Sequence, residues 1–140
     1  MNIFKIYLGG GMSNLSMAEQ NVWRVDIKDY LEEYECDYNV KCINPVDYYT
    51  YDSTTYDSDL EVMQFDLHKV KHSDLVIINF NDMHSLGSMA ELAIAYDRGI
   101  PVIGLNESEQ QLHPWEYCMC SKIFNNKDDM LNYIKNYYLD

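Results

Sequence analysis

Two identical tetrapeptides contain the carboxylates best placed for chemistry in this 140-residue chain, Ser16-Met17-Ala18-Glu19 and Ser88-Met89-Ala90-Glu91. Each matches a capping box, in which the serine hydroxyl accepts a hydrogen bond from the amide three residues on and the glutamate carboxylate accepts one from the serine amide. This structural role is one interpretation of both glutamates. The other is chemical, because a carboxylate in the first turn of a helix is kept ionised by the helix dipole and suits nucleophilic attack or stabilisation of a cationic centre.

The two glutamates differ in their distance from the strands that precede them. An apolar run at 75–80 predicts a buried strand, and a short loop over 81–87 leads from it toward Glu91. Glu91 should therefore lie near the tip of that strand. Glu19 lies ten residues beyond Gly9, where the first predicted strand stops, so it should be displaced outward. Glu91 is the stronger candidate for a chemical role.

The apolar pattern predicts strands and helices in alternation. Short apolar runs typical of buried strands occupy residues 3–8, 41–44, 75–80 and 101–105, with a weak fifth strand near 121–124. Helical periodicity predicts helices from Ser16 onward, over 59–72, over 88–98 and from about Met130 to Tyr138. Residues 46–58 form the longest predicted loop, and a polar loop containing His113-Pro114-Trp115 precedes the weak strand.

This order predicts an α/β fold, with one domain over residues 1–140 and a flavodoxin-like (Rossmann-like) parallel sheet of five strands covered by helices on both faces. Right-handed crossovers favour the strand order 2-1-3-4-5. Ligands of such sheets bind beyond the carboxyl ends of the strands, where the strand order reverses. Here that point is the crevice between the first and third strands, which the loops at 9–15 and 81–87 should face.

The net charge of the chain excludes two classes of partner. Ten Lys and Arg against 23 Asp and Glu give a net charge of −13, which repels phosphate backbones and anionic lipid, so we expect neither polymeric nucleic acid nor a membrane as partner. No apolar run reaches about 18 residues, and no signal peptide is recognisable at the N-terminus. We therefore expect a cytoplasmic protein with reduced thiols at its four cysteines, Cys36, Cys42, Cys118 and Cys120.

Four segments, taken in order, resemble a known family. They are Ile6-Tyr7-Leu8-Gly9-Gly10, then Phe65-Asp66 followed by Ser73-Asp74-Leu75-Val76-Ile77, then Ser85-Leu86-Gly87 with Glu91-Leu92 and Ala95, and finally Pro101-Val102-Ile103. The region from residue 3 to about 105 is thereby similar to the nucleoside 2-deoxyribosyltransferases, a family that includes the 2′-deoxynucleoside 5′-monophosphate N-hydrolases.

The resemblance implies an enzyme that cleaves the N-glycosidic bond of a 2′-deoxynucleoside and needs no cofactor and no metal. Glu91 would attack C1′ to form a deoxyribosyl ester, and a second nucleobase or water would then take the sugar. Tyr7 would orient Glu91, and Asp66 would act near the base, either as proton donor or by handling the leaving purine or pyrimidine. Gly9 and Gly10 would let the backbone approach the ligand. Cleavage of a glycosidic bond by two carboxyl groups needs the same arrangement: an anion on one side of the oxocarbenium-like carbon and an acid at the leaving group.

Ser85 lies six residues before Glu91, at a position where the residue type differs between the two branches of the family that Ser85 and its neighbours resemble. Transferases carry an acidic residue there for the sugar 5′-hydroxyl, whereas the N-hydrolases carry a serine for a 5′-phosphate. Ser85, Gly87 and Ser88 are expected to bind substrate, because amides at a helix N-terminus bind phosphate without a cation. The loop at 9–15 has no Arg or Lys, which counts against a phosphate, and Ser85 could instead be a turn residue.

These observations leave three hypotheses. The first is transfer of deoxyribose between nucleobases, and the alternative is hydrolysis of deoxynucleoside 5′-monophosphates to free base and deoxyribose 5-phosphate. A non-catalytic nucleotide-binding module is the rival from another class, since fold does not fix function. The resemblance also implies a homodimer or higher homo-oligomer.

Several residues have plain structural interpretations as well. Tyr7 could be a core residue and Asp66 a solvated helix residue. His68 and His72 are spaced for metal binding on a helix, but no third ligand is evident and a solvated face is the simpler interpretation. Four tyrosines could stack on a base or fill a contact between loop and core, namely Tyr48, Tyr49, Tyr51 and Tyr56.

Overall fold

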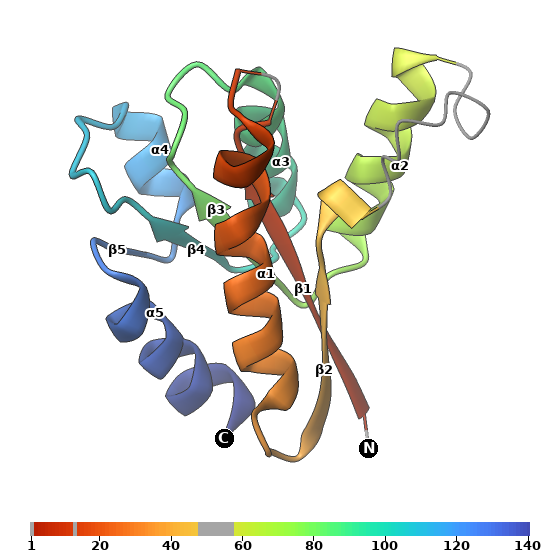
Figure 1. Ribbon diagram of the computed structural model, residues 1–140, viewed down its shortest axis with the longest axis vertical. Helices are drawn as coiled ribbons and strands as arrows, with labels where there is room; N and C mark the ends of the chain where they lie inside the picture. Colours follow the sequence, from red (N-terminus) through yellow and green to blue (C-terminus); the bar gives the residue numbers. More distant parts are fainter. Residues whose placement is uncertain (1, 13, 48–57) are drawn as a thin grey trace.

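The computed structural model contains a five-stranded parallel sheet with the strand order β2-β1-β3-β4-β5 (Figure 1). It describes residues 2–12, 14–47 and 58–140. The strands are β1 (Asn2–Gly10), β2 (Tyr38–Ile43), β3 (Leu75–Asn79), β4 (Val102–Leu105) and β5 (Lys122–Phe124). The predicted fold class and strand order are confirmed, including the weak fifth strand.

Helices cover both faces of this sheet. They are α1 (Met17–Glu33), α2 (Asp59–Lys71), α3 (Leu86–Asp97), α4 (Pro114–Met119) and α5 (Lys127–Ile134), with a 3-10 turn at Pro45–Asp47 and a π-helical segment at Lys135–Leu139. One apolar core joins the sheet to α1 and α5, and a second joins the opposite face to α2, α3 and the end of α4. Figure 1 shows α1 and α5 together on the near side of the sheet.

The alternation of side chains along β1 decides which core each residue enters. Successive residues of a strand point to opposite faces. Ile6 and Leu8 accordingly pack with α1 and α5, whereas Tyr7 packs with α2 and α3. Strand β3 is buried at every position because helices cover it on both sides, which is why its sequence is a continuous apolar run. Tyr7 therefore faces the start of α3, where Glu91 lies.

The predicted capping boxes have different outcomes. Ser16 and Glu19 form one at the start of α1, as predicted. The second prediction is wrong, because α3 begins at Leu86 rather than at residue 88 and its cap is Ser85, whose side chain accepts a hydrogen bond from the Ser88 amide. Glu91 thus lies in the second helical turn and is not part of a cap.

A short helix, α4, replaces part of the predicted polar loop. His113 caps it, Pro114 occupies its first turn, and Glu116 completes a capping box with His113. Proline in the first turn is a helix-start signal, but histidine is not among the usual capping residues, so the sequence pattern resembles a loop.

The remaining expectations concern scattered residues. All four cysteines are free. His68 and His72 lie with ring centroids 4.2 Å apart, and the described part of the chain has no group of three or more side chains that could hold a metal ion. None of its helices is long and apolar enough to cross a membrane. The four tyrosines of the predicted loop lie outside the described residues, namely Tyr48, Tyr49, Tyr51 and Tyr56.

Candidate active site

A cavity of about 600 Å³ opens at the carboxyl end of β1, between α2 and α3. The predicted crevice loops both contribute to it, through Gly10 and Met12 on one side and residues 84–87 on the other. Helix α2 adds a second wall, of which the sequence analysis named only Asp66; it is formed by Asp59, Val62, Met63, Asp66 and Leu67. Strand β1 supplies Tyr7, and the first two turns of α3 supply Ser88, Ala90 and Glu91.

Glu91 and Tyr7 form a buried pair in this cavity. The Tyr7 hydroxyl donates a hydrogen bond to Glu91 Oε2. Glu91 is 8% exposed and Tyr7 is 0% exposed, yet both line the cavity. Asp66 is half-buried on α2 and lines the same cavity. The structure therefore brings together the three residues that the sequence analysis selected for catalysis.

The environment of Glu91 alters its acidity. The pKa of this carboxyl is raised to about 7, chiefly by burial; the charge of Asp66 adds to the rise, and the Tyr7 hydrogen bond and the charge of Arg24 oppose it. The expectation that the helix dipole keeps Glu91 ionised is wrong, because Glu91 lies beyond the first turn of α3. Burial also holds the pKa of Tyr7 well above its ordinary value, so Tyr7 remains a hydrogen-bond donor.

The two glycines at the end of β1 contact the site in different ways. A Cβ on Gly9 would lie 2.6 Å from Ile78 Cδ1 and 3.3 Å from Glu91 Oε1. Gly9 thus makes room for the Glu91 carboxylate and is not among the residues that line the cavity. Gly10 does line it, and a Cβ there would lie 2.8 Å from the Trp23 ring.

The start of α3 places Ser85, Gly87 and Ser88 on the cavity wall. The Ser85 and Ser88 hydroxyls lie 2.8 Å apart and share a hydrogen bond. A Cβ on Gly87 would meet nothing within 4 Å, and the first turn of α3 has no acidic residue. This helix end is therefore open toward the cavity and able to accept an anionic group.

Arg24, on α1, is the site residue that the sequence reasoning missed. It lines the cavity and is 0% exposed. Its sequence signal is its register, since Arg24, Ile27 and Leu31 fall three and four residues apart on the buried stripe of α1. An arginine in an apolar stripe is unexpected because burying its charge is costly.

Glycine substitutions test this packing. Gly9→Ala is expected to lower the free energy of unfolding by about 1–3 kcal/mol, because the added methyl group collides with Ile78 and presses on Glu91. Gly87→Ala is the control, and should leave stability unchanged or raise it by up to about 1 kcal/mol, since the methyl group meets open space within a helix. Urea unfolding measures both, and equal stabilities would contradict the close approach at Gly9.

The sequence and the fold were compared with known proteins. The family described as "Nucleoside 2-deoxyribosyltransferase like" matches residues 3–109. No match was found among curated proteins.

Solved structures with the same fold cover nearly the whole chain. A conserved protein from Enterococcus faecalis V583 is 19% identical with a TM-score of 0.77, over 96% of this chain and 98% of that one. A 2-deoxyribosyltransferase from Bacillus psychrosaccharolyticus is 18% identical with a TM-score of 0.72, over 95% and 91% of the two chains. A CMP N-glycosidase from Clostridium botulinum is 21% identical with a TM-score of 0.60, over 95% and 98%.

These structural likenesses establish a shared fold, and the family match extends over more than half of the sequence. The buried Tyr7–Glu91 pair lies at the predicted crevice. The chain belongs to the nucleoside 2-deoxyribosyltransferase-like family.

Proposed function

We propose that the protein cleaves the N-glycosidic bond of 2′-deoxynucleosides through a deoxyribosyl-glutamate intermediate and transfers the deoxyribose to another nucleobase. The observation that carries the proposal is the buried Tyr7–Glu91 pair on the wall of a cavity of about 600 Å³. Family membership supports an enzyme of the glycosyltransferase or N-glycosidase kind, and so do neighbours that are a 2-deoxyribosyltransferase and a CMP N-glycosidase.

The proposed reaction has two displacement steps at C1′. An oxygen of ionised Glu91 attacks C1′, the C1′–N bond breaks, and its electron pair leaves with the base, which takes up a proton. A nitrogen of an incoming base then attacks C1′, breaks the ester, frees the Glu91 carboxylate and loses its proton. Tyr7 holds the carboxylate in one orientation and favours its ionised form through the hydrogen bond to Oε2.

Helix α2 is the proposed side for the nucleobase. Asp66 lines the cavity opposite α3 and would exchange the proton with the leaving and incoming bases. Val62, Met63 and Leu67 line the same wall, and they give an apolar surface suited to a planar ring. The sugar would then lie between this wall and Glu91.

A second candidate function is hydrolysis of 2′-deoxynucleoside 5′-monophosphates. The observation that favours it is the open N-terminus of α3, where the Ser85 and Ser88 hydroxyls line the cavity without an acidic residue in the first turn. A 5′-phosphate could accept hydrogen bonds from these hydroxyls and from the amides of the first turn. Water would then replace the second base in the displacement of the ester.

Product analysis distinguishes the candidates. The protein is incubated with deoxyinosine plus adenine, and separately with each deoxynucleoside 5′-monophosphate and with CMP. Base exchange to deoxyadenosine supports transfer, whereas free base with deoxyribose 5-phosphate supports hydrolysis. Thermal stabilisation by a nucleotide without any product would contradict both and support a binding module. Glu91→Gln is the control for contaminating activity.

The pH dependence is a separate prediction. Because only ionised Glu91 can attack, kcat/KM is expected to rise with pH about tenfold per unit on the acid side and to level off above a midpoint near pH 7. Tyr7→Phe removes a hydrogen bond that lowers the pKa of Glu91, so its midpoint should move to higher pH. Initial rates at limiting substrate between pH 5 and 9 measure this, and a flat profile would contradict it.

A further inference from the structure

Arg24 is a fully buried cation that forms no ion pair within the described part of the chain. Its Nε donates to the Leu8 carbonyl at 3.0 Å, its Nη2 to the Gly10 carbonyl at 3.0 Å, and its Nη1 to the Gln20 carbonyl. Burying a charge without a counter-charge is costly even when its hydrogen bonds are satisfied. A role in the site would explain why an arginine occupies this position.

Arg24 and Glu91 approach the end of β1 from opposite faces of the sheet. Side chains at consecutive strand positions point to opposite faces, so a Cβ on Gly9 would point toward α3 and a Cβ on Gly10 toward α1. A Cβ on Gly9 would lie 3.3 Å from Glu91 Oε1, and a Cβ on Gly10 would lie 3.4 Å from Arg24 Nη2. Both residues of β1 at this point are glycine, so β1 itself places no side chain between the two charged groups.

We propose that Arg24 is a positioning residue for Glu91: its guanidinium fixes the last residues of β1 through the Leu8 and Gly10 carbonyls and presents a positive charge to the Tyr7–Glu91 pair across the two glycines. The inference rests on the proposed role of Glu91. Three charged or polar groups face Glu91, namely Tyr7 from β1, Asp66 from α2 and Arg24 from α1. Arg24 is the cation among them, and it offsets the effect of burial on the carboxylate.

Two physical properties of arginine suit it to this position. Its pKa is lowered by burial to about 10, so the guanidinium stays charged at neutral pH. Its planar fork sends separate N–H groups to three carbonyls in different directions, which the single ammonium of lysine cannot reproduce in the same geometry. Arg24→Lys therefore keeps the charge and loses the positioning, whereas Arg24→Gln loses both.

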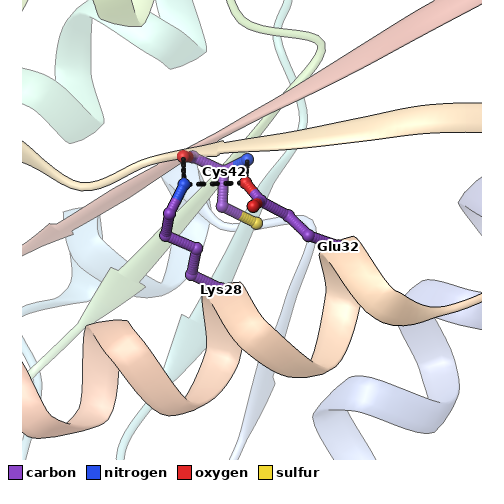
Figure 2. A network of polar contacts seen from close by, with 3 residues as sticks. All are labelled: Lys28, Glu32 and Cys42. Atoms are coloured by element: carbon purple, nitrogen blue, oxygen red, sulfur yellow. Dashed lines mark hydrogen bonds and ion pairs between the residues drawn. The ribbon is translucent and has the colours of Figure 1, made fainter.

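Lys28 provides a matched control on the same helix (Figure 2). It lies one turn after Arg24 and also reaches a strand, donating to the Cys42 carbonyl at 3.0 Å. It is paired with Glu32 at 2.8 Å, and Glu32 in turn accepts a hydrogen bond from the Cys42 amide. Lys28→Gln thus removes a cation that ties α1 to a strand without touching the cavity.

The experiment measures the pKa of Glu91 and the kinetics in the same variants. Glutamate labelled with ¹³C at its carboxyl group is followed by NMR against pH, and the Glu91 signal is assigned by its absence in Glu91→Gln. Arg24→Gln is expected to raise the pKa of Glu91 by about one pH unit, and to lower kcat by about 10–100-fold with KM within about threefold. Lys28→Gln should change neither.

Arg24→Lys separates the two parts of the inference. It should keep the pKa of Glu91 close to that of the wild type while kcat still falls about tenfold. A folded Arg24→Gln with unchanged pKa and kcat would overturn the proposal, and so would wild-type kcat in Arg24→Lys, which decides the matter if Arg24→Gln does not fold. Full turnover in Glu91→Gln would instead refute the proposed function. The NMR titration needs no activity, so it tests the effect of Arg24 on the pKa of Glu91 in that case too.

Discussion

Glu91→Gln is expected to lower kcat by at least about 10³-fold, because an amide cannot form the deoxyribosyl ester. The same substitution should stabilise the protein. The pKa of Glu91 rises from 4.5 to about 7 on folding, so the native state binds more protons than the unfolded state between these values. Wild-type stability therefore falls as the pH rises through this window, by about 3 kcal/mol in total. Glutamine does not ionise and avoids this loss.

Urea unfolding at several pH values, together with assays of turnover, measures both effects. The stability advantage of Glu91→Gln should be largest above pH 7 and shrink toward pH 5. Glu19→Gln is the matched control, because it alters the same tetrapeptide at a fully exposed position where Ser16 lowers the pKa of the carboxyl. It should leave kcat unchanged and weaken the protein slightly. Turnover within tenfold of the wild type in Glu91→Gln would refute its role as nucleophile.

The fold was predictable because the buried strands are continuous apolar runs. The run at β3 indicates a strand covered on both faces, and the alternation of such runs with helical stripes leaves few parallel topologies. Short elements were harder to identify. Helix α4 has six residues, and its cap is a histidine. A pattern of this length carries little periodicity.

The site was predictable where local sequence determines position, and not where packing does. Glu91 follows β3 closely in sequence, and Tyr7 lies on the face of β1 that α3 covers. Both side chains therefore reach the same crevice. The predicted cap at Ser88 failed because Ser85 offers the same chemistry three residues earlier. Arg24 was missed because its importance depends on the carbonyls of β1, which sequence periodicity does not place beside it.

Asp66→Asn is expected to lower kcat by about 10²–10⁴-fold, because the leaving base loses its proton donor while the cavity keeps its shape. If Asp66 acted only through its charge, the same substitution would raise activity and not lower it. The charge of Asp66 raises the pKa of Glu91, so its removal should leave more Glu91 ionised and move the acid limb of the pH profile to lower pH. A fall in kcat together with that movement assigns the loss to proton transfer.

The choice of leaving group tests this assignment for Asp66. In a p-nitrophenyl glycoside of 2-deoxyribose, the leaving p-nitrophenolate departs without protonation, so Asp66→Asn should process this substrate at a rate close to the wild type. Glu61→Gln is the control, because Glu61 is an exposed acid of α2 that is not among the cavity-lining residues. It should behave as the wild type with both substrates. Equal losses for the nucleoside and the nitrophenyl substrate in Asp66→Asn would show that Asp66 binds the sugar or shapes the cavity and does not donate the proton.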